Sequence, residues 1–104
     1  MDQETFDKVV NQAISRSITL LNKKGKEYTS DDDRLRQFKK TAIMESKLPT
    51  ETLFTMADKH ISSIADMVNH PRDFTIVYWQ SKVDDLRNYT FLLDALIVEM
   101  SEEE

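Results

Sequence analysis

The sequence has 104 residues, with one glycine, two prolines, no cysteine and a formal net charge of −5. This length predicts one domain over residues 1–104, and so few turn-forming residues argue against a β-sandwich or barrel. The acidic balance argues against nucleic-acid binding, and the lack of cysteine excludes disulfides and thiolate metal sites. Without a signal peptide or an apolar run of roughly 20 residues, we expect a soluble cytoplasmic protein rather than a membrane protein.

Apolar residues at steps of three and four predict the first helix over residues 3–24. Gly25 follows two lysines and is expected to end this helix, because glycine reaches the left-handed conformation and cations favour a C-terminal dipole. A polar connection leads to the second helix, over residues 33–46, and Pro49 blocks its continuation. In the first helix, the stripe expected to face inward consists of Phe6, Val9, Val10, Ala13, Ile14, Leu20 and Leu21.

The third helix is predicted up to residue 68 with Thr50 as its cap, and a fourth over residues 74–100 with Asp73 as its cap. Nearly every position from 89 to 98 is apolar, and a helix that is apolar on most sides must be covered on most sides. Three partner helices from one small chain do not suffice for this. We therefore expect an all-α, compact four-helix bundle-like domain that forms a homo-oligomer, a dimer or higher, with a frayed acidic tail over residues 101–104.

Polar residues border the apolar stripes of the last two predicted helices. Spacing places Lys59, Ser62, Ser63 and Asp66 on one face of the third helix. On the fourth helix, a matching group has each member within one turn of the next and consists of Lys82, Asp85, Asn88 and Tyr89. If these helices pack side by side, the two faces converge on a polar pocket. An ordinary surface pair between Lys82 and Asp85 is an equal alternative, and His60 is expected in the core.

Three segments, "KGKEYTSDDDRLRQFKKTA", "KHISSIADMV" and "KVDDLRNYTFLLDALI", resemble the nucleotide-modification-associated domain family of small phage and bacterial proteins in their order and spacing. The resemblance covers most of the chain, from about residue 21 onward. It implies a phage-encoded or prophage-encoded protein of the host cytoplasm that is linked to nucleotide metabolism or modified bases. The residues that match the family pattern are Lys24, Glu27, Tyr28, Arg34, Leu35, Phe38, Ala42, Lys59, His60, Ser63, Ile64, Asp66, Asp85, Asn88 and Tyr89.

The helical pattern is also similar to that of the MazG-like NTP pyrophosphatases, which hold magnesium with Glu-x-x-Glu and Glu-x-x-Asp motifs. This sequence offers "KHISSIAD" and "DLRN" in the corresponding regions. A protonated lysine cannot ligate a metal, and asparagine is a weaker ligand than aspartate. Nucleotide binding is therefore better supported than nucleotide hydrolysis, and whether the protein is an enzyme stays open.

We expect a site for a small nucleotide, in which cations contact phosphate or base and a tyrosine stacks on the base. The predicted nucleotide-binding residues are Tyr28, Arg34, Lys59, Lys82, Asn88 and Tyr89. Asp66 and Asp85 would position the cations or hold Mg²⁺. A different hypothesis is a phage accessory or anti-defence protein that binds a host protein or sequesters a signalling nucleotide.

Overall fold

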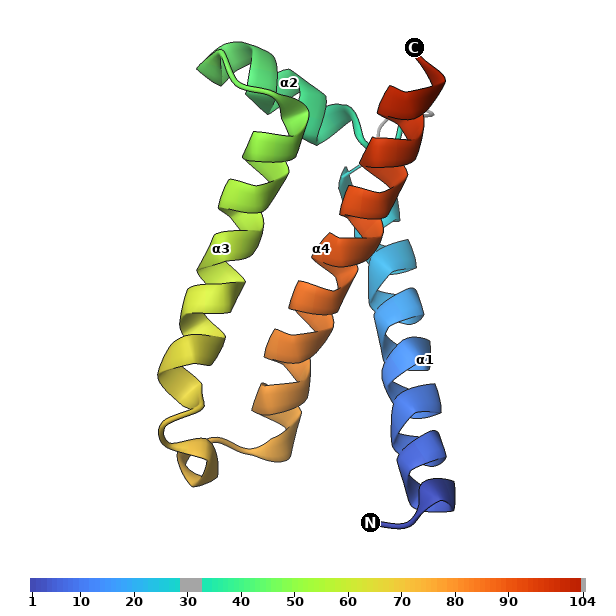
Figure 1. Cartoon of the computed structure of the whole chain (residues 1–104), viewed down its shortest axis with the longest axis vertical. Helices are drawn as coiled ribbons and strands as arrows, with labels where there is room; N and C mark the ends of the chain where they lie inside the picture. Colours follow the sequence, from blue (N-terminus) through green and yellow to red (C-terminus); the bar gives the residue numbers. More distant parts are fainter. Residues whose placement is uncertain (29–32, 104) are drawn as a thin grey trace.

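The computed structural model describes residues 1–28 and 33–103, with residues 27 and 28 described by their backbone alone. Over these residues the chain forms α1 (Gln3–Tyr28), α2 (Arg36–Glu45), α3 (Pro49–Met67), a short 3₁₀ helix (Pro71–Asp73) and α4 (Ile76–Glu102). The predicted all-α class and compact helical bundle are therefore confirmed (Figure 1). None of the helices in the described ranges is long and apolar enough to cross a membrane.

α4 is the central helix of the bundle. It packs against α3 on one side and α1 on the other, while α2 lies across one end of α3 (Figure 1). α1 and α4 run in the same direction, and α3 runs opposite to both. The buried core lies where α2, α3 and α4 meet, and its members are Leu35, Phe38, Leu53 and Leu96.

The residues at the starts of α3 and α4 differ from the caps predicted from the sequence. α3 begins at Pro49, whose fixed φ suits the first helical position, and the Glu51 carboxylate accepts a hydrogen bond from the Leu48 N–H at 3.2 Å. α4 is capped by Thr75, whose hydroxyl oxygen accepts a hydrogen bond from the Tyr78 N–H at 3.1 Å. Predicting Thr50 and Asp73 as caps was therefore wrong.

Gly25 does not end α1, which continues to Tyr28. The glycine is helical and does not adopt a positive φ, so the left-handed stop expected from the sequence is absent at this position. The space beside it is occupied by the side chain of Arg34. A Cβ at Gly25 would lie 2.9 Å from Nε of Arg34, closer than such contacts occur.

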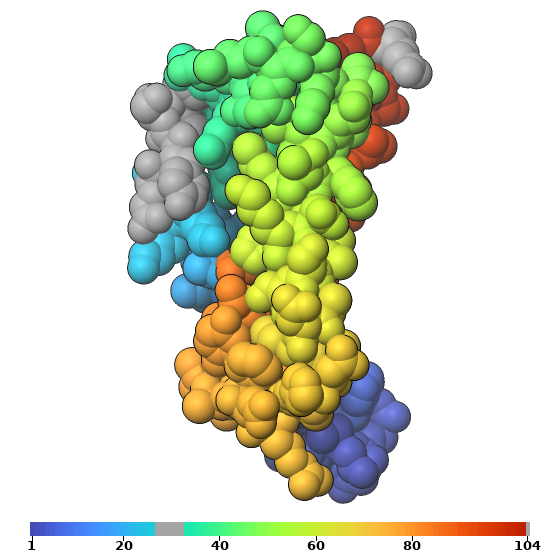
Figure 2. Space-filling view, turned by 90° about the vertical axis from the view of Figure 1, so that its left-hand side faces the viewer, coloured from blue at the N-terminus to red at the C-terminus, as the bar shows by residue number. Residues whose placement is uncertain are grey.

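The apolar stripe of α1 is buried only in part, which corrects the expectation that all of it faces inward. In the second half of α1, Ser17 is buried and Leu20 and Leu21 are half-buried. In the first half, Phe6 and Val10 are exposed, because α1 diverges from α4 towards its N-terminus (Figure 1). Figure 2 shows the same end of α1 projecting beyond the rest of the molecule.

A buried carboxylate joins α1 to α4. Asp84 accepts hydrogen bonds from Nε of Arg16 at 2.9 Å and from Nη1 of Arg87 at 2.7 Å. The same Nη1 donates to Oγ of Ser17 at 2.8 Å. Four polar side chains thus satisfy one another across the α1–α4 interface, where an isolated carboxylate would cost several kcal/mol.

A second cluster of ion pairs connects the N-terminal part of α2 to the C-terminal part of α4. Nζ of Lys39 lies 2.7 Å from Asp33 and 2.6 Å from Glu99. The hydrogen bond from Lys39 lowers the pKa of Asp33, and the bonds to Asp33 and then Glu99 raise the pKa of Lys39 above its ordinary value.

Replacing Asp84 with alanine is expected to lower the free energy of unfolding by about 2–3 kcal/mol, as two arginines lose their shared acceptor. Both arginines are about a third exposed and can partly return to water, which keeps the loss below that of a fully buried pair. Urea denaturation followed by circular dichroism measures the change. Asp94→Ala, at an exposed position of the same helix, is the matched control and should be neutral. Equal losses in both variants would contradict the role given to Asp84.

The Lys39 cluster should make stability pH-dependent in acid. Because the pKa of Asp33 is lowered in the folded state, its contribution is present above the ordinary value of 3.8 and is lost as the pH falls through the folded pKa. The contribution of Lys39 is present below its ordinary pKa and is lost only in strong alkali. We expect the urea midpoint of Lys39→Met to fall less steeply than that of the wild type below about pH 4. The exposed Lys40→Met should keep the wild-type slope.

Candidate functional site

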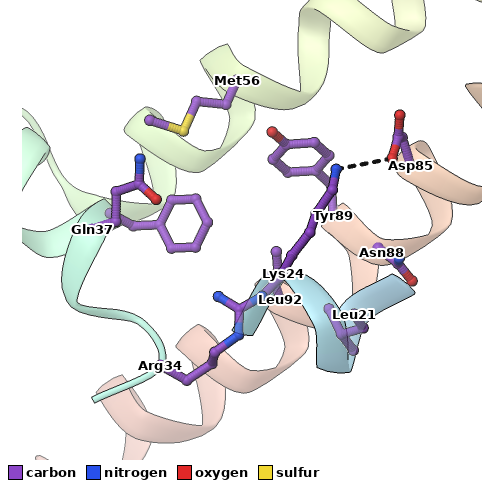
Figure 3. Close-up of a pocket in the computed structure, with 10 residues that line it drawn as sticks. Leu21, Lys24, Arg34, Gln37, Met56, Asp85, Asn88, Tyr89 and Leu92 are labelled. Carbon is purple, nitrogen blue, oxygen red and sulfur yellow. Dashed lines mark hydrogen bonds and ion pairs between the residues drawn. The ribbon is translucent and has the colours of Figure 1, made fainter. Parts of the chain in front are cut away.

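A cavity of about 200 Å³ lies where all four α-helices approach one another (Figure 3). It borders the hydrophobic core, because Phe38 belongs to the core and Met56, Tyr89 and Leu92 pack against it. Its volume is below the roughly 300–1,000 Å³ of pockets that enclose drug-sized ligands. The lining residues are Leu21, Lys24, Arg34, Gln37, Phe38, Met56, Asp85, Asn88, Tyr89 and Leu92.

α4 provides one wall of the cavity. Its contributions are spaced three or four residues apart, which places them on one face of the helix, and they are Asp85, Asn88, Tyr89 and Leu92. α1, which packs against α4, contributes Leu21 and Lys24 (Figure 3). The cavity therefore depends on the docking of α1 against α4.

Asp85 carries the negative charge of the cavity and lies between two basic groups. Its Oδ1 is 3.2 Å from Nζ of Lys24, and its Oδ2 is 3.9 Å from Nδ1 of His60. The His60 ring in turn lies against Tyr89, with 5.1 Å between the ring centroids. His60 is thus half-buried beside the site rather than a simple core residue.

Arg34 lies between the cavity and a second, more open depression on the surface of α1. It lines both hollows together with Leu21, and Gly25 and Lys26 line only the depression. The Arg34 side chain crosses Gly25 closely enough that an added Cβ would meet both Nε and Cδ, at 2.9 and 3.3 Å. The single glycine of the chain therefore makes room for this arginine.

Asn88 is the unusual member of the lining. Its side chain is 5% exposed, yet neither Nδ2 nor Oδ1 has a hydrogen-bond partner among the residues that the structure describes. Burying such a group without a partner costs about 1–3 kcal/mol. The amide therefore lies inside the wall of the cavity, where other atoms cover both its donor and its acceptor.

Four of the predicted site residues meet at this cavity: Arg34, Asp85, Asn88 and Tyr89. Lys59 and Asp66 do not line it, because α3 turns Met56 towards the cavity and leaves both charged residues exposed. The predicted convergence of the two polar faces is wrong in this respect.

Two other predictions concern residues outside the cavity lining. Lys82 lies over the ring of Tyr78, with Nζ 5.3 Å from the centroid, and Asp85 is paired with Lys24 instead. The side chain of Tyr28 lies outside the described residues. Its predicted stacking role therefore stays a prediction.

Sequence reasoning did not include Lys24, Gln37 or Phe38 among the binding residues. A weak signal existed for Lys24, which continues the apolar stripe of α1 three residues after Leu21. No periodic signal distinguishes Gln37, because its place in the cavity depends on how α2 crosses the end of α3.

The described residues do not fit the magnesium site that the sequence suggested. They contain no group of three or more histidine, cysteine or acidic side chains placed to hold a metal ion. Asp66 is not in the cavity with Asp85, and the ammonium group of Lys24 lies 3.2 Å from Asp85, where it would repel a cation. Mg²⁺ prefers several oxygen ligands in octahedral geometry, which these side chains do not supply.

Comparison with known proteins finds no family model, no curated protein and no solved structure that matches the chain. The resemblance to the nucleotide-modification-associated domain family therefore stays a prediction from the sequence.

The buried amide leads to a prediction about stability. Asn88→Leu should raise the free energy of unfolding by about 1–2 kcal/mol, because it removes buried polar atoms without partners, and the cavity can accept the larger side chain. Urea denaturation measures the gain, and Asn69→Leu at an exposed position is the control that should show none. A loss of stability in Asn88→Leu would show that the amide has a partner in the folded chain.

Proposed function

We propose that the protein binds a small nucleotide, with the base in the cavity and the phosphates over the adjoining depression of α1. The observation that carries this proposal is the buried amide of Asn88 in a cavity that Lys24 and Arg34 border. A ligand that satisfies the amide recovers the cost of burying it, so the site favours a polar ligand over a purely apolar one.

The chemistry of the cavity suits a nucleobase. An asparagine amide presents a donor and an acceptor side by side, and base edges carry the complementary pair of groups. Tyr89 and Phe38 border the same space, and aromatic side chains stack on bases of any kind. A cavity of about 200 Å³ would enclose part of a nucleotide and leave the rest outside.

The phosphates would lie where the basic side chains gather. Arg34 lines both hollows, Lys26 lines the depression, and Lys24 reaches the cavity from the same helix. An arginine can hold phosphate oxygens with two parallel hydrogen bonds. The chain as a whole is acidic, with a net charge of −5, so this local group of cations is well suited to attract an anion.

The sequence resemblance supports the same proposal. Among the residues that match the nucleotide-modification-associated domain family, six line this cavity, namely Lys24, Arg34, Phe38, Asp85, Asn88 and Tyr89. On this basis the protein would be phage-encoded or prophage-encoded and would act in the host cytoplasm on nucleotide metabolism. The proposal is one of binding, in which Asp85, the carboxylate of the cavity, is engaged with Lys24.

Isothermal titration against a panel of ribonucleotides and deoxynucleotides, with and without Mg²⁺, tests the proposal. We expect at least one member to bind without Mg²⁺, and Arg34→Gln to weaken that binding at least tenfold through loss of the phosphate contact. Asn88→Leu should also weaken it at least tenfold while the fold remains at least as stable as that of the wild type.

Two control variants separate a site effect from a general change of charge or polarity. Lys59→Gln removes one positive charge from an exposed position outside the cavity and should leave affinity unchanged. Thr52→Val removes another buried group that lacks a partner among the described residues, again outside the cavity lining, and should also bind normally. No heat with any nucleotide, from a protein with an intact helical spectrum, would reject nucleotide binding and favour a protein partner.

A further inference from the structure

An apolar ridge on α1, between residues 6 and 18, is exposed on the surface of the described chain. Its members recur at steps of four residues and are Phe6, Val10, Ile14 and Ile18, with exposed fractions of 51%, 38%, 41% and 48%. In Figure 1, α1 and α4 move apart towards the N-terminus of α1, while the C-terminal part of α1 packs against α4. A row of exposed apolar side chains favours burial against a partner surface, because apolar area removed from water stabilises the folded state.

The solvent-accessible surface area of the chain indicates how much area an interface with a partner could bury. The chain exposes 7709 Å², whereas a folded monomer of 12.2 kDa is expected to expose about 6,100 Å². Its radius of gyration is 15.9 Å, compared with about 13 Å for an average domain of this length. A standard interface between two proteins removes about 800 Å² from each partner, so the surplus is large enough for one such interface.

We infer that the ridge is covered by the same ridge of a second copy of this chain, with the two α1 helices antiparallel about a two-fold axis. Ridges at steps of four residues interdigitate when two helices cross, and a two-fold axis lets one ridge serve both copies. The covering surface is therefore the same apolar ridge on the second copy, which matches the first in length and in apolar character.

The charges of α1 favour the antiparallel orientation. Acidic residues outnumber basic ones near its start, where Asp2, Glu4 and Asp7 accompany Lys8. Basic residues outnumber acidic ones near its end, where Lys23, Lys24 and Lys26 accompany Glu27. An antiparallel pair brings the acidic end of one helix towards the basic end of the other, and it also opposes the two helix dipoles. A parallel pair would bring like charges together. This inference does not depend on whether the cavity binds a nucleotide.

Sedimentation velocity of the full chain at about 100 μM tests the dimer. The wild type should sediment as a species of about 24 kDa, twice the 12.2 kDa of one chain. Val10→Glu should sediment as a monomer that keeps its helical circular dichroism. Ile43→Glu, at an apolar position of α2 that is 80% exposed, should remain dimeric. A monomeric wild type, or a dimer that persists in Val10→Glu, would overturn the inference.

Disulfide formation tests the orientation, because the chain has no cysteine of its own. Under air oxidation, an equimolar mixture of Val10→Cys and Ile14→Cys should form a covalent dimer on a non-reducing gel, because a two-fold axis at the centre of the ridge places position 10 of one copy opposite position 14 of the other. Asp2→Cys should not form one, because antiparallel helices hold the two copies of position 2 far apart. Efficient cross-linking through position 2 would indicate parallel helices and would overturn the proposed arrangement.

Discussion

The position of α1 depends on the buried carboxylate of Asp84, which binds Arg16 from one helix and Arg87 from its own. A carboxylate is tolerated at this depth only because hydrogen-bonded cations compensate its lost hydration. Lys24 and Leu21 lie within about two turns of Arg16 on the same helix. The ion pair that joins the two helices therefore also places the α1 side of the cavity.

Two neighbouring acidic residues on α4 have different surroundings. Asp84 faces α1 and is enclosed in a satisfied network, whereas Asp85 lies about 100° further around the helix and lines the cavity with Lys24 at its edge. One turn further along, Asn88 is buried with no partner among the described residues. Buried polar groups that satisfy one another hold a fold together, whereas the unpartnered amide of Asn88 lowers the stability of the fold.

The helices could be predicted from periodicity, but their rotation and approach could not. On α4, the spacing of Asp85, Asn88 and Tyr89 is enough to place them together, because that relation lies within one helix. Lys59 and Lys24 both border apolar stripes in the sequence. The packing of whole helices leaves Lys59 exposed and directs Lys24 into the cavity, which periodicity alone does not predict. Gly25 follows two lysines, a pattern typical of a helix end, yet α1 continues past it. The neighbour of Gly25 in the folded chain is Arg34, a contact that the local sequence does not reveal.

The parallel run of α1 and α4 has a consequence for the order in which the molecule forms. The hydrogen bonds that join these helices connect residues 61, 68 and 70 positions apart, so each closes a long loop. α3 and α4 are neighbours in sequence and close only a short loop when they pair, whereas α1 stays without its docking surface until α4 has been synthesised. During synthesis, Lys24 and Asp85 can therefore meet only late, when the central helix has left the ribosome.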